Sequence, residues 1–235
     1  MKPTLVYTQN VKNFVATMQL VEKRMGHDSL AMIWGRAGRG KSRTARWYAA
    51  QNDWVYLESK RDWSVMWMFQ DILCAIGVPS DSLPHRKKRA FEQIIELSEE
   101  DPRPIILDEA DLVGSRLLES VRDLCKTMMV PWVLVGEESL TRLMVRDRRV
   151  WSRRCASLEF QPMQIPDIIT FCKEATELTM PGETAGAIQN ATRGDIRLIE
   201  LVLSVSETIA NANKKQEVSI EMAAAAIKKV IPEKA

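Results

Sequence analysis

The chain has 235 residues, of which 46% are hydrophobic and 27% are charged. These proportions are typical of a globular protein with ample material for a core, which excludes a disordered or low-complexity chain. The formal net charge of +2 gives no argument for nucleic-acid binding, so only local basic clusters can make one. No signal peptide opens the chain and no apolar run reaches the ~20 residues of a membrane span, so we expect a cytoplasmic protein.

The first predicted element is an amphipathic helix near the N-terminus, where apolar residues recur at the spacing of one helix face. These residues are Val11, Phe14, Val15, Met18 and Val21. A polar segment ends this helix, and the apolar run 30–34 then predicts a buried strand. We expect the helix to pack on the sheet that begins with this strand.

The stretch 35–42 fits the pattern G-x-x-x-x-G-K-[ST], which is the phosphate-binding P-loop. The strand before it, and residues 41–51 after it, which contain no Gly or Pro, supply the strand–loop–helix context that the motif requires. A chance match in a glycine-rich turn is the alternative.

Each residue type in this motif suits phosphate binding. Gly35, Gly38 and Gly40 allow a tight turn that brings backbone N–H groups close to an anion, beside the positive end of a helix dipole. We expect Lys41 to reach the β- and γ-phosphates of ATP and the Ser42 hydroxyl to bind Mg²⁺. The predicted nucleotide-binding residues of the loop are Gly35, Arg36, Ala37, Gly38, Arg39, Gly40, Lys41 and Ser42.

Strands and helices alternate after the P-loop. Further strands are predicted at the apolar segments 54–57, 104–107, 132–135 and 158–160. Helices are predicted between them, at about residues 62–76, 86–101, 115–128 and 139–145. This order predicts an α/β fold with a parallel five-stranded sheet sandwiched by helices.

The chain changes character after residue 164, since no strand pattern appears beyond it. Helices are predicted there at about residues 166–178, 183–191, 194–210 and 219–230. We therefore expect two domains, a nucleotide-binding α/β domain at residues 1–164 and a small all-helical domain at residues 165–235.

Two acids follow the third predicted strand at a spacing that suits a nucleotide site. Asp108 and Glu109 end an apolar run about 65 residues after the P-loop, which leaves room for another strand and two helices. A carboxylate at this strand tip can hold magnesium through water, so Asp108 joins Ser42 as a predicted magnesium residue. Glu109 is placed to orient and activate the attacking water. Two solvated acids at a strand end are the alternative.

The P-loop, the strand ending in Asp108 and Glu109, a polar fourth-strand tip, an arginine-rich turn and a helical lid together resemble the AAA+ ATPases. Within that family the chain is most similar to the transposition-associated group. Bacterial secretion ATPases of the ExeA type share the same motifs. The resemblance covers about residues 10–230. It implies an AAA+ fold and Mg²⁺-dependent hydrolysis of ATP.

The resemblance also implies roles for residues outside these motifs. The tip of the fourth strand, where Glu137 stands, would hold the sensor of the γ-phosphate, although many relatives have Asn, Ser or Thr there. An arginine of the turn would reach the nucleotide of a neighbouring subunit, and Arg153 and Arg154 match that position best. Arg197, at a helix start in the lid, matches the second sensor. For each arginine, an ordinary surface residue is the alternative.

Two basic clusters offer contacts to DNA. They consist of Lys60, Arg61, Arg86, Lys87, Lys88 and Arg89. In the resembling group, loops in this part of the sheet line the pore of a helical assembly and follow the DNA backbone. Lys and Arg neutralise phosphates without sequence-specific geometry, so we expect sequence-tolerant binding of duplex DNA. A solvated helix end is the alternative.

These features predict an ATPase that uses ATP and Mg²⁺, associates into a helical filament or ring on duplex DNA, and has no membrane partner. The resemblance implies a role in DNA transposition, in target capture and activation of a transposase, and favours a phage or mobile element in a bacterial host. Three other classes compete. They are a secretion or assembly ATPase without a DNA role, a nucleotide-gated scaffold that hardly hydrolyses ATP, and a P-loop small-molecule kinase.

Overall fold

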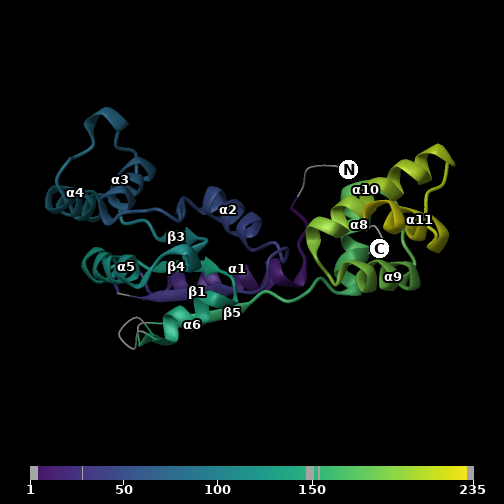
Figure 1. The fold of residues 1–235 in the computed structure, drawn as a ribbon, viewed down its shortest axis with the longest axis horizontal. Coiled ribbons are helices and arrows are strands. Elements are labelled where there is room, and N and C mark those ends of the chain that lie inside the picture. The colour runs from purple at the N-terminus through teal and green to yellow at the C-terminus, as the bar shows by residue number, and fades with distance from the viewer. Residues whose placement is uncertain (1–4, 28, 147–150, 153, 232–235) are drawn as a thin grey trace. The chain divides into compact units, whose positions relative to one another are not determined.

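The computed structural model describes residues 5–27, 29–146, 151–152 and 154–231 (Figure 1). The chain divides into two compact units. The sheet unit comprises Phe14–Arg36 and Lys41–Glu159, and the helical unit comprises Met1–Asn13, Ala37–Gly40 and Phe160–Ala235. The division into domains 1–164 and 165–235 stays a prediction. Within the described residues, no helix is both long and apolar enough to cross a membrane.

The sheet unit contains five parallel strands, as predicted, in the order β2-β3-β4-β1-β5. They are β1 (Leu30–Trp34), β2 (Val55–Glu58), β3 (Ile105–Asp108), β4 (Trp132–Gly136) and β5 (Arg154–Glu159). The residues of β3 and β4 are buried throughout. Parallel strands covered on both faces read as continuous apolar runs, which is why the sequence reveals them.

The fifth strand begins at Arg154, before the predicted start at residue 158. Arg154 pairs with Leu30 of β1, so the expectation that it belongs to the arginine-rich turn was wrong. As an edge strand, β5 is only half buried along most of its length. Its first residues therefore lack the apolar run that marks the inner strands, and the sequence pattern misses them.

Helices cover both faces of this sheet (Figure 1). They are α1 (Gln9–Glu22), α2 (Lys41–Asn52), α3 (Val65–Ala75), α4 (Lys87–Glu100), α5 (Ser115–Met128) and α6 (Glu138–Arg146). One face packs on α3 to α6, in a core that joins Met32 and Leu107 of the strands to Phe69 of α3. The intervening strand residues point to the opposite face. There α1 and α2 pack, with the rings of Phe14 and Tyr48 at 5.6 Å between centroids.

The strand register brings the carboxyl ends of three strands to one level. Trp34 of β1 pairs with Gly136 of β4, and Leu107 of β3 pairs with Leu134 of β4. The P-loop and the loops that follow β3 and β4 therefore begin at the same edge of the sheet. This edge is where ligands bind in open parallel sheets.

The described part of the helical unit contains four helices, as predicted. They are α8 (Ile165–Thr176), α9 (Gly182–Thr192), α10 (Ile196–Ala212) and α11 (Ile220–Val230). Their inward faces form one apolar core, which includes Phe171, Ile188 and Ile199. The N-terminal segment belongs to this unit, because Val6 joins the core and the Gln9 N–H donates to the Asp167 carboxylate at 2.9 Å.

Candidate nucleotide-binding site

The P-loop leaves β1 at Trp34 and leads into α2 at Lys41. Three of its residues have positive φ angles, Gly35 at 145°, Gly38 at 73° and Gly40 at 89°. L-residues with a side chain seldom adopt such angles, so this path requires glycine. The glycines of the motif thus serve the sharp turn for which a phosphate-binding loop needs them.

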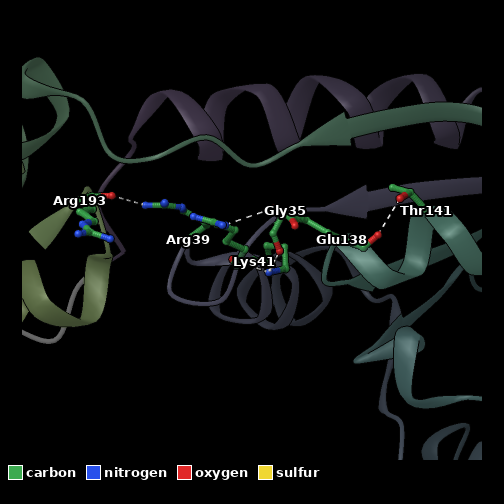
Figure 2. A network of polar contacts seen from close by, with 7 residues as sticks. Gly35, Arg39, Lys41, Glu138, Thr141 and Arg193 are labelled. Carbon is green, nitrogen blue, oxygen red and sulfur yellow. Dashed lines mark hydrogen bonds and ion pairs between the residues drawn. The ribbon is translucent and has the colours of Figure 1, made fainter.

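The Lys41 side chain folds back onto the loop that precedes it. Its Nζ donates to the carbonyl oxygens of Gly35 at 2.6 Å and of Arg36 at 2.9 Å. Lys41 is 8% exposed, and Figure 2 shows its ammonium turned toward Gly35. A buried ammonium held by loop carbonyls adds positive charge at the start of α2, where a polyphosphate would bind. Arg36 itself points outward, with its Nε 3.4 Å from Glu138.

Asp108, at the end of β3, is 2% exposed, and both of its carboxylate oxygens accept hydrogen bonds. Its Oδ1 accepts the backbone N–H of Glu109 at 2.8 Å, and its Oδ2 accepts the Tyr56 hydroxyl at 2.6 Å. A carboxylate that only accepts suits the charged form, which is the form that attracts a magnesium ion. The buried ammonium of the P-loop and this buried carboxylate thus fit a magnesium–nucleotide ligand.

Glu109 follows in a left-handed conformation, with φ 51° and ψ 34°, and its side chain is exposed. Partial burial, and then the nearby charges of Glu58, Asp108, Asp111 and Glu137, raise the pKa of Glu109. A raised pKa makes a carboxylate a better proton acceptor, provided that it is ionised at the working pH.

Asp111 joins the turn after β3 to the loop after β4. Its Oδ1 accepts the backbone N–H of Glu137 at 2.9 Å, and its Oδ2 accepts the Ser139 hydroxyl at 3.0 Å. Sequence reasoning missed both this residue and Tyr56. A third acid so soon after Asp108 was the available signal for Asp111, and the aromatic hydroxyl in a buried strand was the signal for Tyr56.

Glu137 lies directly after β4, with an exposed side chain. The structure therefore brings Lys41, Asp108, Glu109 and Glu137 to one edge of the sheet, at the ends of three neighbouring strands. Ser42 stands in the first turn of α2, beside Lys41. The assignment of a sensor role to Glu137 stays a prediction, as do the roles of the other residues.

Two arginines, Arg153 and Arg154, were predicted to reach the nucleotide of a neighbouring subunit, and the structure describes Arg154. Arg153 lies outside the described residues, with Arg148 and Arg149 of the same turn. Arg154 is the first residue of β5, and its guanidinium carbon lies 3.7 Å from the centroid of the Trp151 ring. Because Arg154 pairs with Leu30, the first residue of β1, it lies at the amino ends of the strands. The P-loop follows the last residue of β1, about 13 Å away along the strand. Arg154 is thus far from its own P-loop.

Arg197 lies in the first turn of α10, within the helical unit, and is exposed. The Asp195 carboxylate caps this helix by accepting the Arg197 N–H at 2.9 Å, and the Arg197 Nε lies 3.7 Å from the same oxygen. P-loop residues 37–40, which belong to the helical unit, contact the same start of α10. The Ile196 N–H donates to the Gly38 carbonyl at 2.8 Å, and a Cβ on Gly38 would overlap the Asp195 carboxylate.

Arg39 of the P-loop makes a further contact within the helical unit. Its Nη1 donates to the carbonyl oxygen of Arg193 at 2.8 Å, as Figure 2 shows. Arg193 has a positive φ of 53° and immediately precedes Gly194. Residues 37–40 are therefore fastened to the start of α10 by backbone and side-chain hydrogen bonds. The predicted second-sensor role of Arg197 stays a prediction.

The first basic cluster lies between β2 and α3. Lys60 is exposed, but its Nζ contacts the Asp71 carboxylate at 2.6 Å and lies 4.9 Å from the centroid of the Trp67 ring. Arg61 beside it is exposed. The Lys60 side chain is half exposed while that of Asp71 is mostly covered, so the cation can still be reached by a phosphate.

The second basic cluster opens α4, where Arg86 is the N-cap residue. The four side chains of this cluster, at residues 86–89, are exposed. Lys88 and Arg89 pair with Glu92 at 3.6 Å and Glu96 at 2.8 Å on the same helix. Basic residues in the first turn oppose the helix dipole, so their presence there is not explained by helix stability.

The comparisons with known proteins agree with this geometry. Residues 23–144 match the family model described as AAA domain. The ATP-dependent target DNA activator B of Escherichia phage Mu is 28% identical over 136 residues, which cover 57% of this chain and 42% of the relative. The match therefore spans less than half of that relative's length.

Two solved structures have the same fold over the whole of this chain. Cdc6p from Pyrobaculum aerophilum has a TM-score of 0.75 at 17% identity, and covers 100% of this chain and 71% of its own. The Aeropyrum pernix ORC2 protein, in ADPNP–ADP complexes, has a TM-score of 0.70 at 13% identity, covering 100% and 72%. At these identities the likeness shows the fold alone.

Proposed function

The chain belongs to the AAA domain family, and we propose that it is an ATPase that assembles on duplex DNA and acts in DNA transposition. The observation that carries the ATPase proposal is the placement of Lys41 and Asp108. They are a buried cation and a buried anion, and both lie at the carboxyl ends of the parallel strands. A lysine on the phosphates and an aspartate near the magnesium are recurring parts of P-loop ATPase sites.

The site residues have separate roles in this proposal. The N–H groups of the glycine-rich loop and the Lys41 ammonium bind the phosphates, while Ser42 and Asp108 hold Mg²⁺. When bound, the metal neutralises charge on the phosphate oxygens. Glu109 orients the attacking water and accepts its proton, and its raised pKa suits that task. Glu137 and Arg197 are the proposed sensors of the nucleotide state.

The position of Arg154 supports a proposal of self-association. An arginine that starts at the sheet edge opposite its own P-loop is available to a second subunit. We infer that Arg154, together with Arg153, completes the nucleotide site of a neighbouring chain in a ring or helical filament. ATP would then favour assembly, because the phosphates offer the arginine a charged partner across the subunit boundary.

The DNA role rests on the phage Mu relative and on the two basic clusters. That relative is an ATP-dependent target DNA activator, which supports target capture and activation of a transposase as the function here. The exposed cations at residues 60–61 and 86–89 are proposed to contact the DNA backbone. Many subunits along one duplex would multiply weak contacts into tight binding. A phage or mobile-element protein in the bacterial cytoplasm fits this function.

The test is fluorescence anisotropy of a labelled duplex at two salt concentrations, with and without ATP, together with ATP turnover. We expect ATP to tighten duplex binding, salt to weaken it steeply, and the duplex to stimulate hydrolysis. If ATP fails to tighten binding at either salt concentration, the transposition proposal is wrong. A secretion or assembly ATPase of the ExeA type, or a nucleotide-gated scaffold, then becomes the better candidate.

A further inference from the structure

We propose that Tyr56 is a positioning residue that fixes the orientation of the Asp108 carboxylate toward magnesium, and that Arg46 connects this hydroxyl to the helix that follows the P-loop. The inference rests on the proposed ATPase function and deepens it. Its basis is a chain of contacts within the sheet unit, from α2 through β2 to β3. The three residues stand on three different elements of that unit.

The sheet register places Tyr56 and Asp108 on the same face. Tyr56 pairs with Ile106, and Glu58 pairs with Asp108, on the adjacent strands β2 and β3. Side chains two residues apart on a strand share a face, so Tyr56 lies diagonally next to Asp108. Leu107, between Ile106 and Asp108, points instead into the core under α3 to α6. Tyr56 therefore faces the side of the sheet on which α2 packs.

The Tyr56 hydroxyl holds one oxygen of the carboxylate while the backbone holds the other. The hydroxyl lies 2.6 Å from Asp108 Oδ2, and the Glu109 N–H lies 2.8 Å from Oδ1. Two donors on opposite oxygens leave the carboxylate little freedom to rotate about its bond to Cβ. Each oxygen keeps a further lone pair, which could accept from a magnesium-bound water.

Arg46 fixes the direction of the hydrogen bond at the hydroxyl. Its Nη2 lies 3.3 Å from the Tyr56 oxygen and 2.9 Å from Glu58 Oε2, and its guanidinium carbon lies 5.2 Å from the ring centroid. Guanidinium only donates and an ionised carboxylate only accepts, so the hydroxyl must accept from Arg46 and donate to Asp108. A hydroxyl that accepts from a cation is a stronger donor to the next group.

The position of Arg46 relates this chain of contacts to the P-loop. Arg46 stands four residues after Ser42 on α2, which is about one helical turn, so both lie on one face of that helix. The chain of contacts that holds Asp108 thus ends on α2, one turn after the predicted magnesium residue Ser42.

The test compares Tyr56→Phe with Tyr48→Phe in the full chain. Tyr48 is the matched control, since its hydroxyl donates to Glu22 at 2.9 Å and its loss leaves Asp108 untouched. Binding of a fluorescent ATP analogue is titrated with Mg²⁺, and also measured in EDTA. For Tyr56→Phe we expect the Mg²⁺ midpoint to rise by about 10-fold or more, as for other outer-shell partners of metal ligands, with unchanged binding in EDTA. The control should match wild type.

Two outcomes overturn the inference alone. One is a wild-type Mg²⁺ midpoint in Tyr56→Phe, and the other is an equal shift in Tyr48→Phe. If wild type shows no magnesium-dependent binding of the analogue, the proposed function itself is wrong. Should Tyr56→Phe fail to fold, Arg46→Met replaces it, because Arg46 is exposed and the change removes its donors and its charge while keeping an unbranched side chain. It should shift the midpoint in the same direction by a smaller factor, and a wild-type midpoint contradicts the inference.

Discussion

The carboxylate of Asp111 occupies the space that a side chain on Gly136 would need. A Cβ built on Gly136 would lie 2.5 Å from Asp111 Oδ1, which accepts the Glu137 N–H at 2.9 Å. The turn after β3 therefore packs directly against the tip of β4. Position 136 requires glycine because the Asp111 carboxylate lies so close, and not because of its backbone angles. Through this contact, the turn that carries Glu109 is coupled to the loop of the proposed sensor.

We expect Gly136→Ala to destabilise the protein by roughly 1–3 kcal/mol, the usual cost of overpacking a buried site. The added methyl must displace the Asp111 carboxylate or the Leu140 side chain, whose Cδ2 would lie 3.2 Å away. Urea unfolding followed by circular dichroism measures the decrease in stability. Gly182→Ala, at the start of α9, is the control because a methyl group there would meet no neighbouring atom within 4 Å. Equal stability of the two variants would contradict the packing argument.

Lys41→Ala and Glu109→Gln should separate nucleotide binding from hydrolysis. The first removes the buried ammonium of the P-loop and should abolish most ATP binding. The second keeps the shape of the side chain but removes the proton acceptor, so binding should persist while turnover slows by ~10² or more. Equilibrium titration with a fluorescent nucleotide and a phosphate-release assay measure the two effects. Equal nucleotide affinity in wild type and Lys41→Ala would contradict the P-loop assignment.

The raised pKa of Glu109 predicts how hydrolysis depends on pH. Glu109 must be ionised to accept a proton, so turnover should fall as the pH drops through its pKa, at a higher pH than for an ordinary glutamate. After burial, Glu58 is the largest cause of the rise. Glu58→Gln should therefore lower this pKa and move the acid limb of the pH–rate profile to lower pH.

Glu159→Gln is the control for the pH profile. Glu159 is exposed at the end of β5 and is not among the charges that raise the Glu109 pKa. Its variant should keep the wild-type acid limb. An acid limb that stays in place in Glu58→Gln, or moves upward, would show that another group sets the pH dependence.

Arg154→Ala should bind ATP normally yet fail to hydrolyse it. Mixing this variant with Glu109→Gln should restore part of the turnover, because a site formed between the two chains can combine an intact Glu109 with an intact Arg154. Turnover against mixing ratio, and the assembly state by light scattering, are the measurements. Arg116→Ala, an exposed arginine at the start of α5, is the control. Absence of recovery at every ratio, with normal assembly, would indicate a plain surface arginine.

The fold and the centre of the candidate site could be predicted from the sequence for physical reasons. Buried parallel strands appear as apolar runs, and a tight phosphate loop needs glycine at three positions. The supporting contacts were not accessible. Tyr56 and Asp108 are distant in sequence, and only the register of β2 against β3 brings them together. Nothing local to Asp111 indicates that its partners follow β4.

The beginning of β5 escaped prediction for a similar reason. Arg154 reads as part of a basic turn because an edge strand is half exposed and carries polar residues. Its neighbour on the sheet, Leu30, lies more than a hundred residues earlier in the chain. Ion pairs made by the basic clusters, such as Arg89 with Glu96, were likewise not predicted, since seven residues, about two helical turns, separate the two side chains.

The decisive prediction for function concerns the basic run at residues 86–89. Replacing all four residues by Ala should weaken binding to every duplex alike, because phosphate contacts carry no sequence information. The plot of log affinity against log salt should become shallower by as much as about 0.9 for each phosphate that the protein no longer neutralises. Binding of ATP should be unchanged, since the run opens α4 and is absent from the P-loop and the ends of β1, β3 and β4.

A matched comparison separates a local contact from a general decrease in positive charge. Arg86→Ala with Lys87→Ala removes two exposed cations from the run, and Lys228→Ala with Lys229→Ala removes two from the last turn of α11. Anisotropy titrations of both pairs, at two salt concentrations with ATP present, measure the salt slopes. The salt slope of the Arg86/Lys87 variant should be shallower than that of wild type, and the salt slope of the Lys228/Lys229 variant should be unchanged. Equal slopes in the two pairs would mean that overall charge, and not this helix start, attracts the duplex.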